Sequence, residues 1–192
     1  AHHVGLSHVF KMVKAFREKD DKTPIILMGY ANPIEAIGAG TFVERAKSSD
    51  VDGIITVDYP PEECMEFTKL LKEKNIDSIF LLSPTSELDR VKLIIEQASG
   101  FLYYVSLKGV TGAANIDIEQ VKSKVGMIRE LTDLPIGVGF GVKDAATAKE
   151  VAKISDAVVV GSRMVQEIES SNKENLIQNI SKLMKELREA VN

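Results

Sequence analysis

The sequence predicts an α/β fold built on a parallel β-sheet. Short apolar, β-branched segments occur six times along the 192 residues, and segments with helical periodicity lie between them. Alternating strands and helices are typical of a parallel sheet covered by helices. The apolar segments are near-continuous rather than alternating, which indicates strands that are buried on both faces.

The predicted strands follow one another at intervals of roughly 20 to 35 residues, the length of one strand–helix unit. The strands are Thr23–Tyr30, Asp52–Tyr59, Ser78–Pro84, Phe101–Leu107, Pro135–Gly141 and Asp156–Ser162. The helices are His8–Lys19, Pro61–Lys74, Ser86–Ala98, Ile116–Leu131, Lys143–Ile154 and Lys173–Glu189, with a short helical stretch at Arg163–Glu169. No helix is assigned to residues 31–51.

Two architectures agree with this order of elements: a doubly wound open sheet and a (β/α)8 TIM barrel. A complete barrel has eight strands and about 250 residues, so six strands would be about three quarters of one. The chain begins with Ala1 and not with Met, and we interpret this start as the interior of a longer sequence. No linker-like tract rich in Pro, Gly or Ser divides residues 1–192, which are therefore interpreted as one incomplete domain.

The overall composition narrows the classes of function. The formal net charge is −4, which argues against nucleic-acid binding because that function needs a basic face. No apolar run approaches the roughly 18 residues of a membrane span. Cys64 is the only cysteine, which excludes a disulfide framework and a cysteine-based zinc site. We expect no metal and a cytoplasmic location.

Glycine-rich segments follow three of the predicted strands, at the carboxyl ends where parallel α/β folds place their functional groups. These segments are Lys108–Ala113, Gly139–Gly141 and the pair Gly161 and Ser162. Glycine lets the backbone approach a ligand closely. The last pair precedes a short helical stretch, and a helix N-terminus presents N–H groups to a phosphate. Three such segments together favour a phosphate site over simple tight turns.

A dinucleotide site is the weaker alternative. Gly137, Gly139 and Gly141 form G-x-G-x-G rather than G-x-G-x-x-G, and they occur late in the chain. The dinucleotide fingerprint belongs to the first strand–helix–strand unit. The spacing and the position both argue against it.

Asp58 ends another predicted strand, just before Tyr59 and two prolines. A carboxylate at this point is expected either to cap the next helix, through the N–H groups of residues 62–64, or to face the mouth of the site. The sequence leaves both possibilities open.

Taken together, these segments resemble the α subunit of tryptophan synthase. The resemblance is colinear and extends over nearly the whole chain. The matching segments are Gly29–Ile34, Val57–Glu63, Tyr103–Gly112, Gly139–Gly141 and Val160–Ser162. The Gly-Val-Thr-Gly run after a Tyr-Tyr strand is highly specific, whereas the last two segments are weak by themselves.

The resemblance implies a TIM barrel in which the predicted strands are strands three to eight. It implies a carbon–carbon lyase of tryptophan biosynthesis, which cleaves indole-3-glycerol phosphate to indole and glyceraldehyde 3-phosphate. It also implies a heterotetramer in which the β subunit receives the indole. Pyridoxal phosphate would be bound by that subunit only, so that no cofactor is expected on this chain.

The resemblance assigns roles to nine residues. Those that would bind the substrate phosphate are Gly112, Gly141, Gly161 and Ser162. Those that would line the indole pocket are Tyr30, Tyr103 and Phe140, with Thr111 on the mobile loop that closes it. Asp58 would lie in the loop that communicates with the β subunit.

The catalytic residues of the family are not matched here. Its general acid/base groups are a Glu in the second strand and an Asp in the loop after it, and both precede the position of Ala1. The chain by itself is therefore expected to be inactive. Two alternatives follow: a catalytically incomplete fragment that binds a phosphate ligand or the β subunit, or another phosphate-binding barrel enzyme such as indoleglycerol-phosphate synthase.

Overall fold

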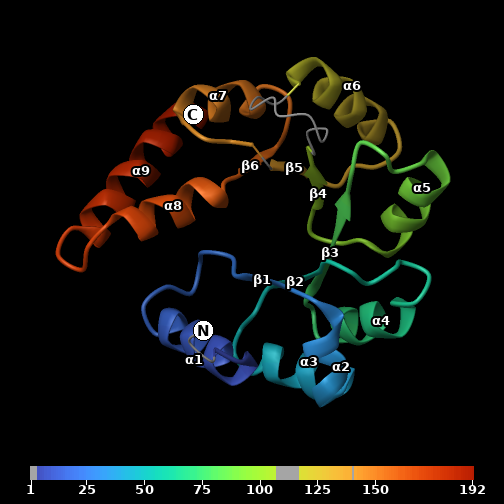
Figure 1. Cartoon of the computed structure of the whole chain (residues 1–192). Coiled ribbons are helices and arrows are strands. Elements are labelled where there is room, and N and C mark those ends of the chain that lie inside the picture. Colours follow the sequence, from blue (N-terminus) through green and yellow to red (C-terminus); the bar gives the residue numbers. More distant parts are fainter. Residues whose placement is uncertain (1–3, 107–116, 140) are drawn as a thin grey trace. The chain divides into compact units, whose positions relative to one another are not determined.

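The computed structural model describes residues 4–106, 117–139 and 141–192 (Figure 1). Within them the strands are β1 (Ile26–Gly29), β2 (Gly53–Thr56), β3 (Asp77–Leu82), β4 (Leu102–Val105), β5 (Ile136–Gly139) and β6 (Ala157–Val159). The helices of the same residues are α1 (Leu6–Arg17), α2 (Ala31–Ile37), α3 (Ala39–Lys47), α4 (Met65–Glu73), α5 (Leu88–Gln97), α6 (Ile118–Arg129), α7 (Ala145–Ala152), α8 (Ser162–Ser170) and α9 (Leu176–Val191). All six predicted strands are present, each shorter than predicted.

The strand pairings are parallel and join strands that are consecutive in the chain. β1 pairs with β2 and β2 with β3, and likewise β4 pairs with β5 and β5 with β6. A doubly wound sheet reverses its strand order at a switch point, and these pairings contain no reversal. The chain divides into two compact units, Ala1–Phe80 with Lys92–Gly100, and Leu81–Val91 with Phe101–Asn192.

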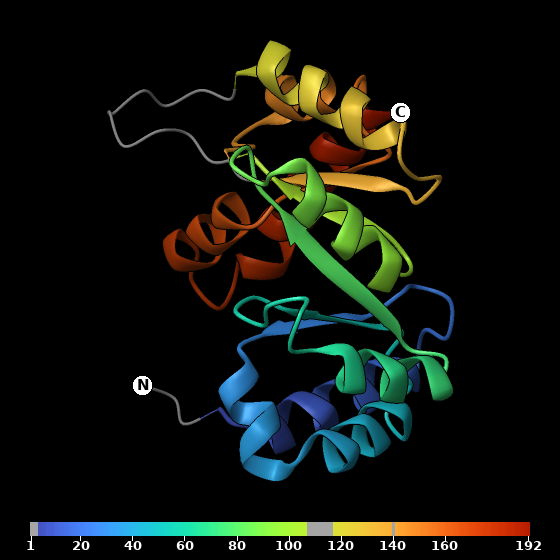
Figure 2. The same cartoon turned by 90° about the vertical axis from the view of Figure 1, so that its right-hand side faces the viewer.

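In the first unit, helices α1, α3 and α4 lie on one face of β1 and β2 (Figures 1 and 2). Three aromatic rings form the centre of this layer: the centroids of Phe10 and Phe42 are 5.7 Å apart, and those of Phe42 and Phe67 are 6.1 Å apart. Val43, Leu71 and other buried apolar residues complete the core. This packing fixes the carboxyl ends of β1 and β2 on a rigid support.

Helices α2 and α3 are absent from the sequence-based prediction, which is wrong for this segment. Pro33 lies in the first turn of α2, where its missing N–H removes no helical hydrogen bond. Gly38 has φ +83° and separates the two helices. Asn-Pro and closely spaced glycines are loop signals. Burial of Phe42 and Ala46 on one face of α3 nevertheless stabilises the helix.

In the second unit, β5 is buried along its whole length, and α7 and α9 pack against each other. Helices α6 and α7 begin at aspartate caps: Asp117 accepts a hydrogen bond from the N–H of Gln120, and Asp144 accepts one from that of Thr147. Such caps satisfy N–H groups that the helix itself leaves unpaired. The pKa of Asp144 is lowered by these bonds to Thr147.

In each unit a hydrogen-bonded clamp ties together the amino-terminal ends of two neighbouring strands, β5 and β6 in the second unit and β1 and β2 in the first. Asp156 accepts a hydrogen bond from the N–H of Ile136 (2.8 Å) and pairs with Arg129 at the end of α6 (3.0 Å). These contacts, the Ile136 N–H first and Arg129 after it, hold the pKa of Asp156 below its usual value. The equivalent clamp of the first unit consists of Asp52, Ile25 and Arg17.

Replacing Asp156 by Ala is expected to lower the free energy of unfolding by about 1–2 kcal/mol at pH 7, because two hydrogen bonds to the carboxylate are lost. The native pKa is lower than the unfolded one, near 4. The contribution is therefore present above about pH 4 and is lost as the pH falls through the native pKa. Urea denaturation at pH 7 and pH 3 measures it.

The control is Glu150→Gln, which breaks only the exposed ion pair with Lys153 and should cost less than about 0.5 kcal/mol. An equal loss for Asp156→Ala at both pH values would contradict the assignment of its stabilising effect to the carboxylate.

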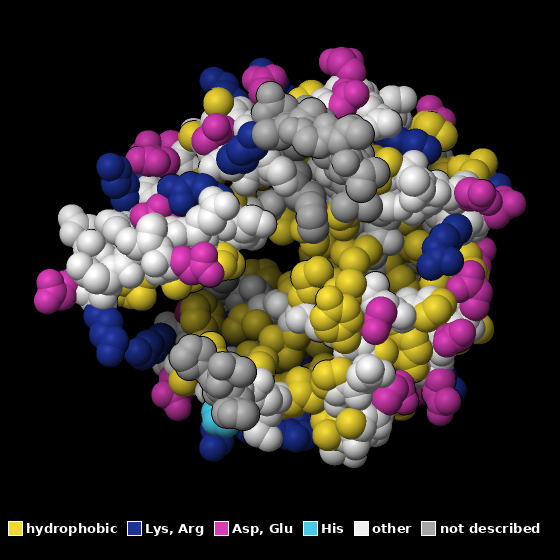
Figure 3. Space-filling model, viewed as in Figure 1, with side chains coloured by type: hydrophobic (Ala, Val, Ile, Leu, Met, Phe, Trp, Pro, Cys, Tyr) yellow, Lys and Arg dark blue, Asp and Glu magenta, His cyan; other side chains and the backbone are white. Residues whose placement is uncertain are grey.

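Charged side chains gather over the helices of each unit, whereas hydrophobic ones gather on the strand side (Figure 3). Met28 and Tyr30, at the end of β1, are among the exposed large apolar side chains. None of the helices that the structure describes is long and apolar enough to cross a membrane.

Candidate functional site

The carboxyl ends of β5 and β6 adjoin the start of α8 (Figure 1). β5 ends at Gly139 and β6 at Val159, so the predicted extension of these strands to Gly141 and Ser162 is wrong. Gly141 has φ +81°, a left-handed conformation that favours glycine and ends the strand. Ser162 is the first residue of α8, and Gly161 is its N-cap. The last strand thus turns directly into a helix.

A cavity of about 210 Å³ opens at this turn. Its lining residues come from β4, from the segment after β5, from the end of β6 and from the first turns of α8: Tyr103, Gly141, Val142, Lys143, Val159, Gly161, Ser162, Arg163 and Gln166. Three of the four predicted phosphate ligands and one predicted indole-pocket residue therefore line the same cavity. The fourth ligand, Gly112, lies outside the described residues, as do Thr111 and Phe140.

Tyr103 lies directly over Gly139. A Cβ atom on Gly139 would be 2.5 Å from the Tyr103 hydroxyl oxygen and 2.7 Å from a ring carbon, so only glycine leaves room for this ring. The end of β5 is held by Ser106, whose Oγ and N–H both donate to the Gly139 carbonyl oxygen (2.9 and 3.0 Å). Burial raises the pKa of Tyr103, and the protonated hydroxyl can donate a hydrogen bond.

The electrostatics of the cavity favour an anion. Gly161 provides no side chain to cap the first turn of α8, and helix N-termini carry a partial positive charge. The side chains of Lys143 and Arg163 add two cations to the lining. Arg163 also pairs with Glu167 one turn later, with 2.7 Å between the guanidinium nitrogen and the carboxylate oxygen.

The sequence-based selection missed Lys143, Arg163 and Gln166, because its phosphate ligands were limited to the glycines and the serine. The sequence does contain a signal that could have identified two of them, Arg163 and Lys143. Arg163 directly follows Ser162 at the helix start, and Lys143 follows the left-handed Gly141 by two residues. A basic side chain beside a glycine turn at a strand end is positioned to reach an anion bound there.

In the first unit, Asp58 accepts a hydrogen bond from the N–H of Ala31, the first residue of α2 (2.8 Å). Asp58 thus caps the helix that follows the neighbouring strand, a partner that neither of the two possibilities left open by the sequence had included. The reason is that β1 and β2 are parallel and paired, so that their carboxyl ends lie side by side. Tyr30 precedes α2 as its N-cap residue and is 62% exposed.

Tyr59 strengthens this link between the loop after β2 and α2. Its hydroxyl donates to Glu35 Oε1 at 2.6 Å, and its ring stacks on Phe67. The hydrogen bond to Glu35, with a smaller effect of burial, raises the pKa of Tyr59 to about 12.

Replacing Tyr59 by Phe is expected to lower the free energy of unfolding by about 1 kcal/mol near neutral pH, because one charge-assisted hydrogen bond is lost. The native pKa lies above the unfolded value of about 10. The contribution is complete below about pH 10 and disappears as the pH rises toward 12. Chemical denaturation at pH 7, and the ultraviolet titration of tyrosinate in both proteins, measure the two effects. If the tyrosine that is lost from the titration curve in Tyr59→Phe is one that titrates at about pH 10 and not at about pH 12, the assignment is contradicted.

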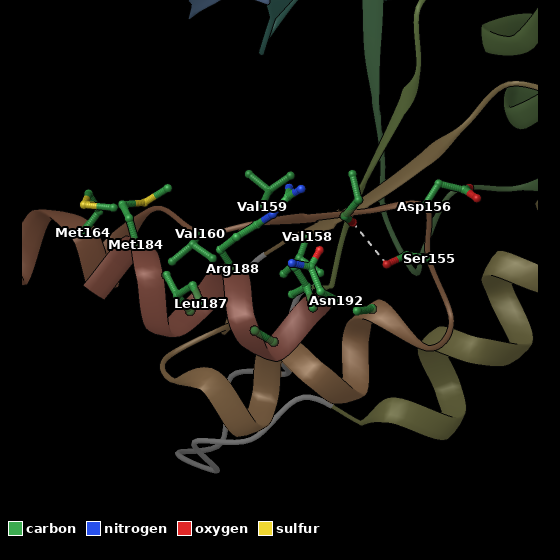
Figure 4. Close-up of a pocket in the computed structure, with 14 residues that line it drawn as sticks. Ser155, Asp156, Val158, Val159, Val160, Met164, Met184, Leu187, Arg188 and Asn192 are labelled. Carbon is green, nitrogen blue, oxygen red and sulfur yellow. Dashed lines mark hydrogen bonds between the residues drawn. The ribbon is translucent and has the colours of Figure 1, made fainter. Parts of the chain in front are cut away.

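A larger cavity, of about 620 Å³, lies beside β6 and is bordered by α7, α8 and α9 (Figure 4). Val158, Val160, Met184 and Leu187 make its lining largely apolar. The carboxylate of Asp156 is already engaged in the strand clamp. This cavity therefore offers a surface for packing and no evident catalytic group.

Comparison with known proteins identifies the family. The family model described as tryptophan synthase alpha chain matches residues 1–192. The chain is 52% identical over 190 residues to the tryptophan synthase alpha chain of Nitrosomonas europaea and 53% identical over 188 residues to that of a Janthinobacterium species. The chain belongs to the tryptophan synthase alpha chain family. These matches cover 99% and 98% of this chain and 69% and 71% of the relatives.

Solved structures of tryptophan synthase support the same family assignment. The alpha subunit from Legionella pneumophila superposes with a TM-score of 0.88 at 34% identity, over 99% of this chain and 71% of that one. A chain of the tryptophan synthase complex from Pyrococcus furiosus superposes with a TM-score of 0.86 at 31% identity. The superposition covers 97% of this chain and 74% of that one. These likenesses confirm the predicted (β/α)8 TIM-barrel class and exclude the doubly wound sheet.

Tryptophan synthase alpha chains are lyases of tryptophan biosynthesis that cleave indole-3-glycerol phosphate and pass the indole to a β subunit. The family match also decides against indoleglycerol-phosphate synthase. In the part of the chain that the structure describes, no cluster of His, Cys, Asp and Glu is arranged to hold a metal ion.

Proposed function

We propose that the cavity at the ends of β5 and β6 binds the phosphate of indole-3-glycerol phosphate. The observation that carries this proposal is that Gly141, Gly161 and Ser162, selected from the sequence, line one cavity together with Tyr103. Backbone N–H groups at the start of α8 and the Ser162 hydroxyl would donate to the phosphate oxygens. Gly112 completes the phosphate site by resemblance.

The indole ring would lie against Tyr103, whose position over Gly139 gives the cavity an aromatic wall. By resemblance, Tyr30, Phe140 and Thr111 are proposed as further residues of the indole site. Holding the phosphate and the ring at once orients the scissile carbon–carbon bond, and such positioning supplies a large part of catalysis.

The cleavage itself needs proton transfers. A proton is added to the indole ring carbon as its bond to the glycerol chain breaks, and a proton leaves the adjacent glycerol hydroxyl, which becomes the aldehyde. In this family a Glu and an Asp do this work, and neither has a match among these residues. A polypeptide of these 192 residues would therefore bind the phosphate ligand without cleaving it.

The partner would be the tryptophan synthase β subunit, in a heterotetramer. Asp58 is placed at an exposed loop that its hydrogen bond joins to α2, which suits a residue that transmits contact with a partner. Pyridoxal phosphate would be bound by the β subunit and not by this chain, and both subunits would work in the cytoplasm.

Calorimetric titration of the chain with sn-glycerol 3-phosphate tests the binding site. We expect saturable one-to-one binding that inorganic phosphate displaces. The absence of binding by folded protein would overturn the assignment of the cavity.

A further inference from the structure

The cavity contains a cationic side chain that the glycine-based phosphate site does not require. Arg163 is the second residue of α8, next to Ser162, and it lines the cavity. Its guanidinium has five N–H donors in a planar fork that matches phosphate oxygens. Its side chain is 31% exposed, so that water screens an ion bound to it only in part.

Glu167 is bound to this same guanidinium. The two side chains are one helical turn apart, their charged atoms are 2.7 Å apart, and the Glu167 side chain is only 18% exposed. Pairs at this spacing contribute little stability at a helix surface. The Arg163 guanidinium can therefore easily exchange the Glu167 carboxylate for a stronger partner. A phosphate dianion bound at the start of α8 would be such a partner, because it carries twice the charge of the carboxylate.

We infer that Arg163 is a phosphate-binding side chain and that Glu167 is its positioning residue, which competes with the phosphate for the guanidinium. In the structure, the Glu167 carboxylate is paired with the Arg163 guanidinium and so occupies part of its hydrogen-bonding capacity. When phosphate binds, the guanidinium transfers one or more hydrogen bonds from Glu167 to the phosphate oxygens. This inference rests on the proposed phosphate site. It adds to that site a side chain whose positive charge increases the affinity for the phosphate dianion.

The alternative hypothesis is that the ion pair of Arg163 and Glu167 only stabilises the surface of α8. Lys185 and Glu189 on α9 provide the comparison, because they form an ion pair at the same spacing (3.9 Å) with both side chains well exposed, and neither lines the cavity. If Arg163 and Glu167 are structural only, their substitution should affect phosphate binding no more than substitution of the α9 pair.

The test measures the Kd of inorganic phosphate, by ³¹P NMR titration at low ionic strength, for the wild-type chain and its variants. Arg163→Gln is expected to weaken binding about tenfold or more, and Arg163→Lys, which keeps the charge without the fork, should weaken it less. Glu167→Gln is expected to strengthen binding about two- to threefold. This gain should decrease in high salt.

The double variant Arg163→Gln/Glu167→Gln decides the positioning role. If Glu167 acts through Arg163, the gain from Glu167→Gln disappears when Arg163 is absent. A gain of the same size in both backgrounds would overturn the positioning role, and an unchanged Kd in Arg163→Gln and Arg163→Lys would overturn the inference as a whole.

The controls Lys185→Gln and Glu189→Gln should leave Kd unchanged, and circular dichroism checks that each variant is folded. A wild-type chain that is folded and binds no phosphate contradicts the proposed site itself. Binding by the wild type with no effect of Arg163 contradicts only the role of Arg163, so that the two failures are distinguishable.

Discussion

A polypeptide of these 192 residues is expected to release no measurable indole from indole-3-glycerol phosphate when assayed alone. The reason is chemical: the Glu and Asp that serve as general acid and base in the family have no match in this sequence. Each such group contributes about 10²- to 10⁴-fold to the rate, so the loss of both reduces turnover below detection. Binding of the substrate phosphate is expected to persist, because the cavity at the start of α8 is contained in this chain.

Adding the preceding segment of a family member, by fusion or co-expression, is expected to restore indole release. The chain spans 69% of the Nitrosomonas europaea relative, and that relative is a suitable donor. β6 offers a surface against which a further strand–helix unit could pack. Among the described residues β6 pairs only with β5, and an apolar cavity lies beside it (Figure 4). Unpaired strand edges and apolar surface favour association with such a segment.

The control for this experiment is the same added segment with its catalytic Glu replaced by Gln, which should associate without restoring activity. Turnover is followed by indole release, and intact mass confirms that the assayed polypeptide begins at Ala1. Robust indole release by that polypeptide alone would show that a general base lies within these residues, and our assignment would be wrong.

Replacing Gly161 by Asp is the substitution with the largest expected effect on phosphate binding. A Cβ atom at this position meets no other atom within 4 Å, so the fold has room for the side chain. A carboxylate about 4 Å from a phosphate repels each of its charges by about 4 kcal/mol at an effective dielectric constant of 20. Binding should therefore weaken by about 10³-fold or more, which abolishes it in practice.

Gly161→Asn is the matched control, because asparagine has nearly the same shape as aspartate without the charge. We expect it to weaken phosphate binding far less and to unfold at a similar denaturant concentration. Calorimetric titration with sn-glycerol 3-phosphate measures both variants. Equal losses would attribute the effect to side-chain volume, and retained binding in Gly161→Asp would exclude the start of α8 as the phosphate site.

Local patterns were sufficient for the strands and for most helices. Continuous apolar runs predicted all six strands, because strands buried on both faces need apolar residues at every position. Local patterns did not predict helices α2 and α3. Asn32, Pro33 and Gly38 are loop signals, and what stabilises this segment is burial of Phe42 and Val43 in the core of the first unit, which is a tertiary contact.

The sequence by itself determined the parallel α/β class and the glycine-rich strand ends, since apolar periodicity and glycine positions are local properties of the chain. Its resemblance to the α subunit of tryptophan synthase added the barrel and the family, because the periodicity alone did not decide between a barrel and an open sheet. Only the tertiary structure decided which side chains meet. It placed Arg163 and Lys143 in the cavity beside Gly161, and it paired Asp58 with the N–H of Ala31 at the start of α2. The physical reason is that parallel pairing brings the ends of neighbouring strands together, so that residues 27 positions apart form a hydrogen bond.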